Sequence, residues 1–137
     1  MADHQSLLNE LEKIAEVKSQ RDLEGTWFND CGTYLQAMIE EVAEVQTEII
    51  ANKQCFLEDE LGDLLWNFVC ILQHLELEHK IDKRKVYERA VKKYKERVTE
   101  RNPEDSWDSV KKQQKLDLEL EFAQSTKYFS PPTIDKP

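Results

Sequence analysis

The chain has 137 residues, enough for one domain with a hydrophobic core. It contains three glycines and four prolines, and 34% of its residues are charged. This composition favours long helices over the tight turns of a β-sandwich or barrel. The net charge of −9 disfavours a nucleic-acid partner, and no apolar run is long enough to span a membrane.

Apolar residues recur at helical spacing near the N-terminus and predict a first helix over residues 4–21. The next segment, residues 22–32, contains two glycines together with Asn29 and Asp30, which is typical of a loop. Trp27 and Phe28 lie inside this loop. We expect both rings to fold back onto the core.

Two further helices are predicted over residues 33–51 and 57–79. Only a short connection separates them, so they are expected to run antiparallel as neighbours. Apolar side chains surround most of the circumference of the helix over 57–79. That helix is therefore predicted to be the most buried of the set.

Asp82 is a candidate N-cap for a fourth helix that continues to about residue 101, before Asn102-Pro103. Ser106 is placed to cap a last helix that begins at Trp107. The segment 116–122 alternates apolar and polar residues, which fits either a strand or a continuation of this last helix.

These elements predict an all-α fold, an antiparallel bundle of about four to five helices whose core is completed by oligomerisation. We assign residues 1–115 to a single helical domain. Residues 116–137 are expected to be a C-terminal extension that is either partly disordered or docked on a neighbouring subunit. The N-terminal residues show no basic stretch followed by an apolar core, so we expect no secretory leader. Three widely spaced cysteines predict reduced thiols in a cytoplasmic protein.

Charge is distributed unevenly along the chain. Residues 80–97 contain nine basic and three acidic side chains, whereas residues 40–63 contain eight acidic side chains and one lysine. Such segments are often solvated helix faces. The alternative is that the acidic segment holds metal cations while the basic one holds phosphate.

Four carboxylates are arranged as a metal site would require. Glu41 and Glu44 are three residues apart in one predicted helix, and Glu60 and Asp63 are three apart in the next. Each pair shares a helix face, and the antiparallel turn brings the pairs to similar levels. Hard oxygen ligands in this number suit Mg²⁺, with Mn²⁺ as a substitute. A di-iron or zinc site lacks the necessary histidine and cysteine ligands.

The strings Glu-Glu-Val-Ala-Glu-Val over 40–45 and Glu-Leu-Gly-Asp-Leu-Leu over 60–65 resemble the MazG nucleoside triphosphate pyrophosphohydrolases. The family signature is ExxE, a spacer and ExxD, and here the spacer has fifteen residues. The similarity continues through Arg101-Asn-Pro103 and the Trp107–Lys111 segment, and covers roughly residues 24–115.

This resemblance implies an all-α homodimer or homotetramer that cleaves nucleoside triphosphates between the α and β phosphates with Mg²⁺. By position, Glu41, Glu44, Glu60 and Asp63 would be the catalytic metal ligands. The residues implied to hold the substrate are Lys93, Arg97, Trp107 and Lys111. Some family members have a basic residue just ahead of each acidic motif, where this chain has Ala37 and Phe56.

Other contacts to the substrate remain open. Asn67 lies one turn beyond Asp63 and is either a base or sugar ligand or a partly exposed helix residue. Trp27 or Phe28 either stacks on a base or fills the core.

A nucleotide-pool house-cleaning enzyme is the function that the resemblance implies. The alternatives are a phosphoribosyl-ATP pyrophosphohydrolase, which the Trp107–Lys111 segment disfavours, and a catalytically silent helical module that binds metal or a protein partner.

Overall fold

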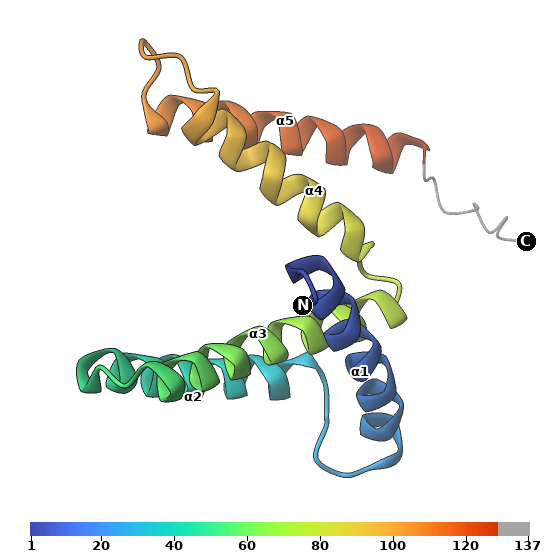
Figure 1. The fold of residues 1–137 in the computed structure, drawn as a ribbon. Helices are drawn as coiled ribbons and strands as arrows, with labels where there is room; N and C mark the ends of the chain where they lie inside the picture. Colours follow the sequence, from blue (N-terminus) through green and yellow to red (C-terminus); the bar gives the residue numbers. More distant parts are fainter. Residues whose placement is uncertain (129–137) are drawn as a thin grey trace, which may run out of the picture. The chain divides into compact units, whose positions relative to one another are not determined.

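The computed structural model describes residues 1–128, and within them every regular element is a helix (Figure 1). The all-α prediction is confirmed. The elements are α1 (His4–Glu24), α2 (Cys31–Ala51), α3 (Gln54–Leu77), α4 (Lys83–Tyr94), the π-helical turn η1 (Lys95–Thr99) and α5 (Trp107–Tyr128).

Capping side chains explain where the helices begin. The Asp30 carboxylate accepts the amide of Gly32 at 2.7 Å, so α2 starts two residues before the predicted position. Asp82 accepts the amide of Arg84 at 3.0 Å, and Ser106 Oγ accepts the amide of Ser109 at 3.0 Å. Both predicted caps are confirmed.

The ambiguous segment 116–122 is helical and continues α5. Its alternating apolar side chains therefore point to different sides of the helix, and each is more than half exposed: Leu116, Leu118, Leu120 and Phe122. Residue 115, where the sequence predicted a domain boundary, lies inside α5. The end of the extension, residues 129–137, lies outside the described residues, and its docking stays a prediction.

The chain divides into two compact units, here called the first unit (Met1–Lys85) and the second unit, which begins at Val86. In the first unit, α2 and α3 run antiparallel side by side, and α1 packs against the C-terminal half of α3 (Figure 1). The turn between α2 and α3 is short because Asn52 adopts the left-handed conformation, with φ of 56°.

The core of the first unit lies around the C-terminal half of α3, which confirms that α3 is the most buried helix. The buried cluster consists of Ala15, Tyr34, Val69, Cys70 and Ile71. The N-terminal half of α3 differs from the prediction, since Leu61, Leu65 and Phe68 remain 47%, 46% and 37% exposed. Leu35, Ile39, Val42 and Ile49 on α2 are exposed in the same way.

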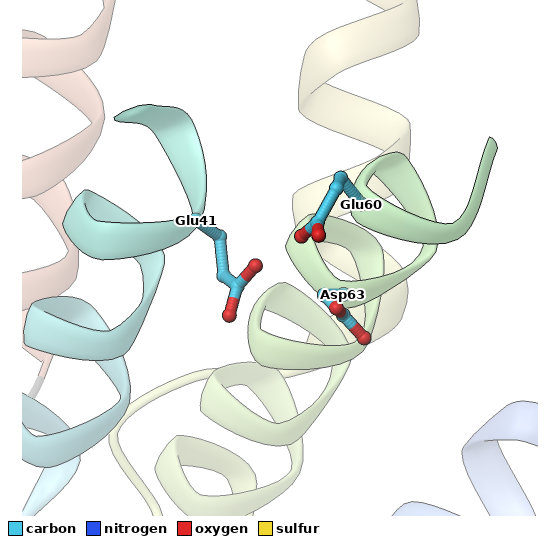
Figure 2. Close-up of side chains that lie close together, drawn as sticks. All are labelled: Glu41, Glu60 and Asp63. Carbon is cyan, nitrogen blue, oxygen red and sulfur yellow. The ribbon is translucent and has the colours of Figure 1, made fainter. Parts of the chain in front are cut away.

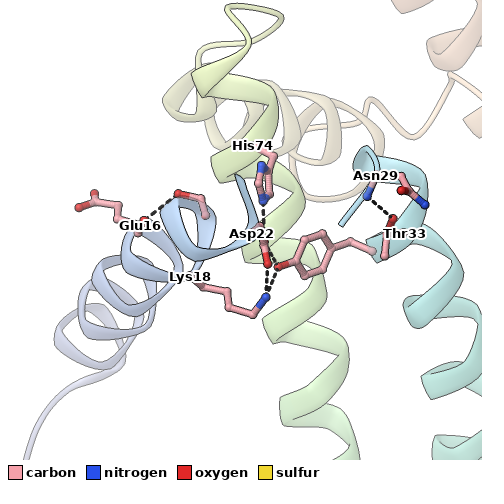
Figure 3. A network of polar contacts seen from close by, with 8 residues as sticks. Glu16, Lys18, Asp22, Asn29, Thr33 and His74 are labelled. Carbon is pink, nitrogen blue, oxygen red and sulfur yellow. Dashed lines mark hydrogen bonds and ion pairs between the residues drawn. The ribbon is translucent and has the colours of Figure 1, made fainter. Parts of the chain in front are cut away.

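A buried polar network joins the three helices of the first unit (Figure 3). Its centre is Asp22 on α1, which accepts hydrogen bonds from Lys18 and Tyr34 and lies 2.8 Å from His74 Nε2. Burial alone would raise the pKa of Asp22, but these hydrogen bonds outweigh it and hold the pKa below its usual value. The network therefore fixes α1 and α2 against α3 through an ionised aspartate.

The loop aromatics pack around this network. Phe28 stacks on the His74 ring at 4.0 Å between centroids, so its predicted return to the core is confirmed. Trp27 packs edge-on against Tyr34 with 5.1 Å between the ring centroids, while 54% of the Trp27 surface stays exposed.

The second unit is a helical hairpin in which α5 returns beside α4 and η1. Arg89 on α4 pairs with Glu121 on α5 at 2.5 Å. The predicted regular helix to residue 101 is replaced at its end by η1, where the Glu100 amide bonds to the Lys95 carbonyl five residues earlier.

None of the three cysteines is in a disulfide, as predicted, and burial raises the pKa of the Cys70 thiol to about 11. Within the described residues, no helix combines the length and apolar character that crossing a bilayer requires.

Candidate metal centre

Three of the four predicted carboxylates converge between α2 and α3. One oxygen each of Glu41, Glu60 and Asp63 lies within 4.8 Å of the other two. Figure 2 shows Glu41 reaching from α2 toward Glu60 and Asp63 on α3. Two oxygens bound to one Mg²⁺ at about 2.0–2.1 Å are at most about 4.2 Å apart, so the three side chains would have to close slightly to contact a single ion.

The environment of these carboxylates is partly buried. Glu41 Oε2 and Glu60 Oε2 are both inaccessible to solvent and have no hydrogen-bond partner among the described residues. Buried oxygens are normally satisfied, and an unsatisfied pair costs free energy. A bound cation would satisfy both, so this donor set fits a hard divalent metal.

The neighbouring carboxylates change the protonation of Glu60. A side-chain hydrogen bond with Glu41 raises the pKa of Glu60 to about 7, and burial and the neighbouring Glu44 add to the shift. Without a cation, the cluster therefore retains a proton near neutral pH. A divalent ion at this place would favour the ionised form instead.

Glu44 is the fourth predicted ligand, and the structure places it less centrally. It is exposed, one turn after Glu41 on α2, and lies outside the group of three converging oxygens. Its effect on the pKa of Glu60 shows that it is nevertheless a neighbour of the cluster.

Asn67 occupies the buried side of α3. Only 6% of its surface is exposed, and its Nδ2 donates to the backbone carbonyl of Asp63 at 2.9 Å. This bond ties Asn67 to the turn of helix that carries Asp63. The side chain thus supports that turn from within the helix.

The predicted substrate-binding residues Lys93, Arg97, Trp107 and Lys111 belong to the second unit. Arg97 is the most constrained of them. Its guanidinium carbon lies 5.5 Å from the centroid of the Tyr94 ring and 5.5 Å from that of the Trp107 ring. Lys93 and Lys111 are exposed.

Sequence reasoning missed Gln114, which contacts Arg97 directly. Arg97 Nε donates to Gln114 Oε1 at 2.7 Å. The only available signal was its position seven residues after Trp107, two turns along the same predicted helix face.

A family model described as MazG nucleotide pyrophosphohydrolase domain matches residues 30–101, just over half of the chain. The matched segment includes all four predicted acidic ligands together with Lys93 and Arg97. No curated protein and no solved structure gave a significant match.

Proposed function

Because this chain belongs to the MazG nucleotide pyrophosphohydrolase family, we propose that it hydrolyses nucleoside or deoxynucleoside triphosphates to monophosphates and pyrophosphate. The observation that carries the proposal is the cluster of Glu41, Glu60 and Asp63, with its two buried and unsatisfied oxygens. A helix pair has no structural need for such a repulsive group.

The residues proposed to hold Mg²⁺ are Glu41, Glu60 and Asp63, with Glu44 as a fourth ligand. Mn²⁺ would serve as a substitute, since it prefers the same oxygen donors. When bound, the ion would neutralise phosphate charge and lower the pKa of a coordinated water.

The glutamates have a second role as proton carriers. The pKa of about 7 belongs to the metal-free cluster, and a bound ion would keep the glutamates ionised and therefore able to accept a proton. One of the glutamates accepts the proton of the attacking water in this proposal.

We propose Lys93, Arg97 and Lys111 as the cations that would contact phosphate oxygens and offset the charge on the leaving pyrophosphate. Trp107 completes this group by packing beside the Arg97 guanidinium.

We also propose that the protein is a homodimer or homotetramer. The exposed apolar residues of α2 include Leu35, Ile39 and Val42, at i, i+4 and i+7. Those of α3 include Leu61, Leu65 and Phe68, with the same spacing. Such stripes are typical of helices that pack against further helices. A cytoplasmic location and a role in clearing unwanted nucleotides complete the proposal.

Product analysis tests the reaction. The protein is incubated with a panel of nucleoside triphosphates and Mg²⁺, and the products are separated by ion-exchange chromatography. Monophosphate with intact pyrophosphate is the expected result, and EDTA should abolish it. Diphosphate with phosphate would overturn the proposal, while turnover of phosphoribosyl-ATP alone would favour the related enzyme class.

A further inference from the structure

The Gln114 side chain uses both ends of its amide within the second unit. Oε1 accepts Arg97 Nε at 2.7 Å, and Nε2 donates to the Lys93 carbonyl and to Glu96 Oε1, both at 3.0 Å. These partners fix the orientation of the amide, because a guanidinium can only donate and a carbonyl can only accept. Gln114 therefore joins α5 to α4 and to the π-helical turn η1.

Arg97 is held on three sides by these surroundings. The rings of Tyr94 and Trp107 are each 5.5 Å from its guanidinium carbon, and Gln114 binds its Nε. Both Nη groups are without a hydrogen-bond partner in the described part of the chain. They form the planar fork with which arginine binds phosphate oxygens in pairs.

We propose that Gln114 is a positioning residue, which directs the Nη fork of Arg97 toward the phosphate oxygens of the substrate. The inference rests on the proposed function, in which Arg97 binds phosphate. A neutral amide suits this role because it accepts from Nε without neutralising the guanidinium. A carboxylate in the same place would compete with phosphate for the positive charge.

The location of Arg97 supports this role. It lies within η1, and π-helical turns occur frequently at functional sites. Gln114 contacts this turn twice, through Arg97 and through Glu96. The side chain thus holds the turn as well as the guanidinium.

The test uses Gln114→Met, which keeps the length of the side chain and removes the amide. Gln113→Met is the matched control, because Gln113 is the neighbouring residue and its Nε2 donates to Asp117 Oδ1 on the exposed surface, at 2.9 Å. The measurements are kcat and KM for a nucleoside triphosphate, and the Kd of inorganic tripolyphosphate by calorimetry. Each is made well below the Tm of the variant.

Gln114→Met should raise KM and the tripolyphosphate Kd about tenfold, with a smaller effect on kcat, as expected for a lost bond to a charged group. Gln113→Met should leave both unchanged. A purely structural role predicts a lower Tm with unchanged tripolyphosphate affinity, and that result would overturn the inference.

A double-mutant cycle shows whether Gln114 acts through Arg97. The double variant Arg97→Ala/Gln114→Met should bind tripolyphosphate no more weakly than Arg97→Ala alone. Additive losses would refute the positioning role. If the wild type binds tripolyphosphate in a Gln114-dependent way but hydrolyses no nucleotide, the proposed function fails and this inference stands. If the wild type hydrolyses nucleotides and Gln114→Met has the same KM and tripolyphosphate Kd as the wild type, the proposed function stands and this inference fails.

Discussion

The protonation of Glu60 makes the stability of the metal-free protein depend on pH in a defined direction. Its pKa is about 7 in the folded chain, against 4.5 in its ordinary state. Between these values the folded state binds more protons than the unfolded state, so stability falls as pH rises from 4.5 through 7. Removing the titrating group by Glu60→Gln should remove this part of the pH dependence.

The assay is thermal unfolding by circular dichroism in EDTA, from pH 5 to pH 8 at constant ionic strength. The Tm of the wild type should decline more steeply with pH than that of Glu60→Gln. Glu58→Gln is the matched control, since it removes the same charge from an exposed position on α3. Its pH dependence should follow the wild type.

At pH 7.5, adding Mg²⁺ should raise the Tm of the wild type and so offset the loss of stability seen in EDTA. An ion present at 100 times its Kd stabilises the folded state by about 2.7 kcal/mol. For a chain of this size, that corresponds to roughly 10 °C in Tm. Equal magnesium stabilisation of Glu60→Gln, or equal pH slopes for wild type and variant, would refute the assignment of the proton and of the ion to this cluster.

Three further outcomes are expected. Asp22→Asn should lower the free energy of unfolding by about 3–5 kcal/mol in urea titrations, because Lys18 and the other partners of Asp22 lose a buried charge. A loss below about 1 kcal/mol would contradict an ionised Asp22 at the centre of the buried polar network. Lys93→Ala should lower kcat/KM about tenfold, whereas an unchanged value would remove Lys93 from the site. Leu65→Glu should shift the protein toward monomer in sedimentation velocity, and an unchanged assembly would exclude this face as the contact.

Local patterns predicted most of the helices because the interactions that define them are short in sequence. Asp82 and Ser106 cap helices through bonds to residues two and three positions later. Hydrophobic periodicity did not decide between helix and strand for segment 116–122. The alternation of segment 116–122 is compatible with a strand, but the segment continues an established helix.

The buried network was not predictable in this way. Asp22 and His74 are separated by 52 residues, and only the packing of α1 on α3 brings them together. The π-helical turn at Arg97 and the contact from Gln114 likewise depend on α5 returning beside α4. No local propensity encodes these contacts.

The acidic cluster was predictable because two helical spacings and one short turn determine it. Glu41, Glu60 and Asp63 converge as the hairpin geometry requires. The outward placement of Glu44 depends on the exact rotation of α2 against α3, which the spacing alone leaves undetermined.

The most direct test of the central claim is the turnover of Asp63→Asn with Mg²⁺, measured beside wild type and Glu58→Gln. The change removes one charge from the cluster, and the amide keeps the size of the side chain. We predict that Asp63→Asn stays folded, with a far-ultraviolet spectrum like that of the wild type, and loses at least about 100-fold in kcat. Full turnover by a folded Asp63→Asn protein would contradict the claim that this cluster is the hydrolytic centre.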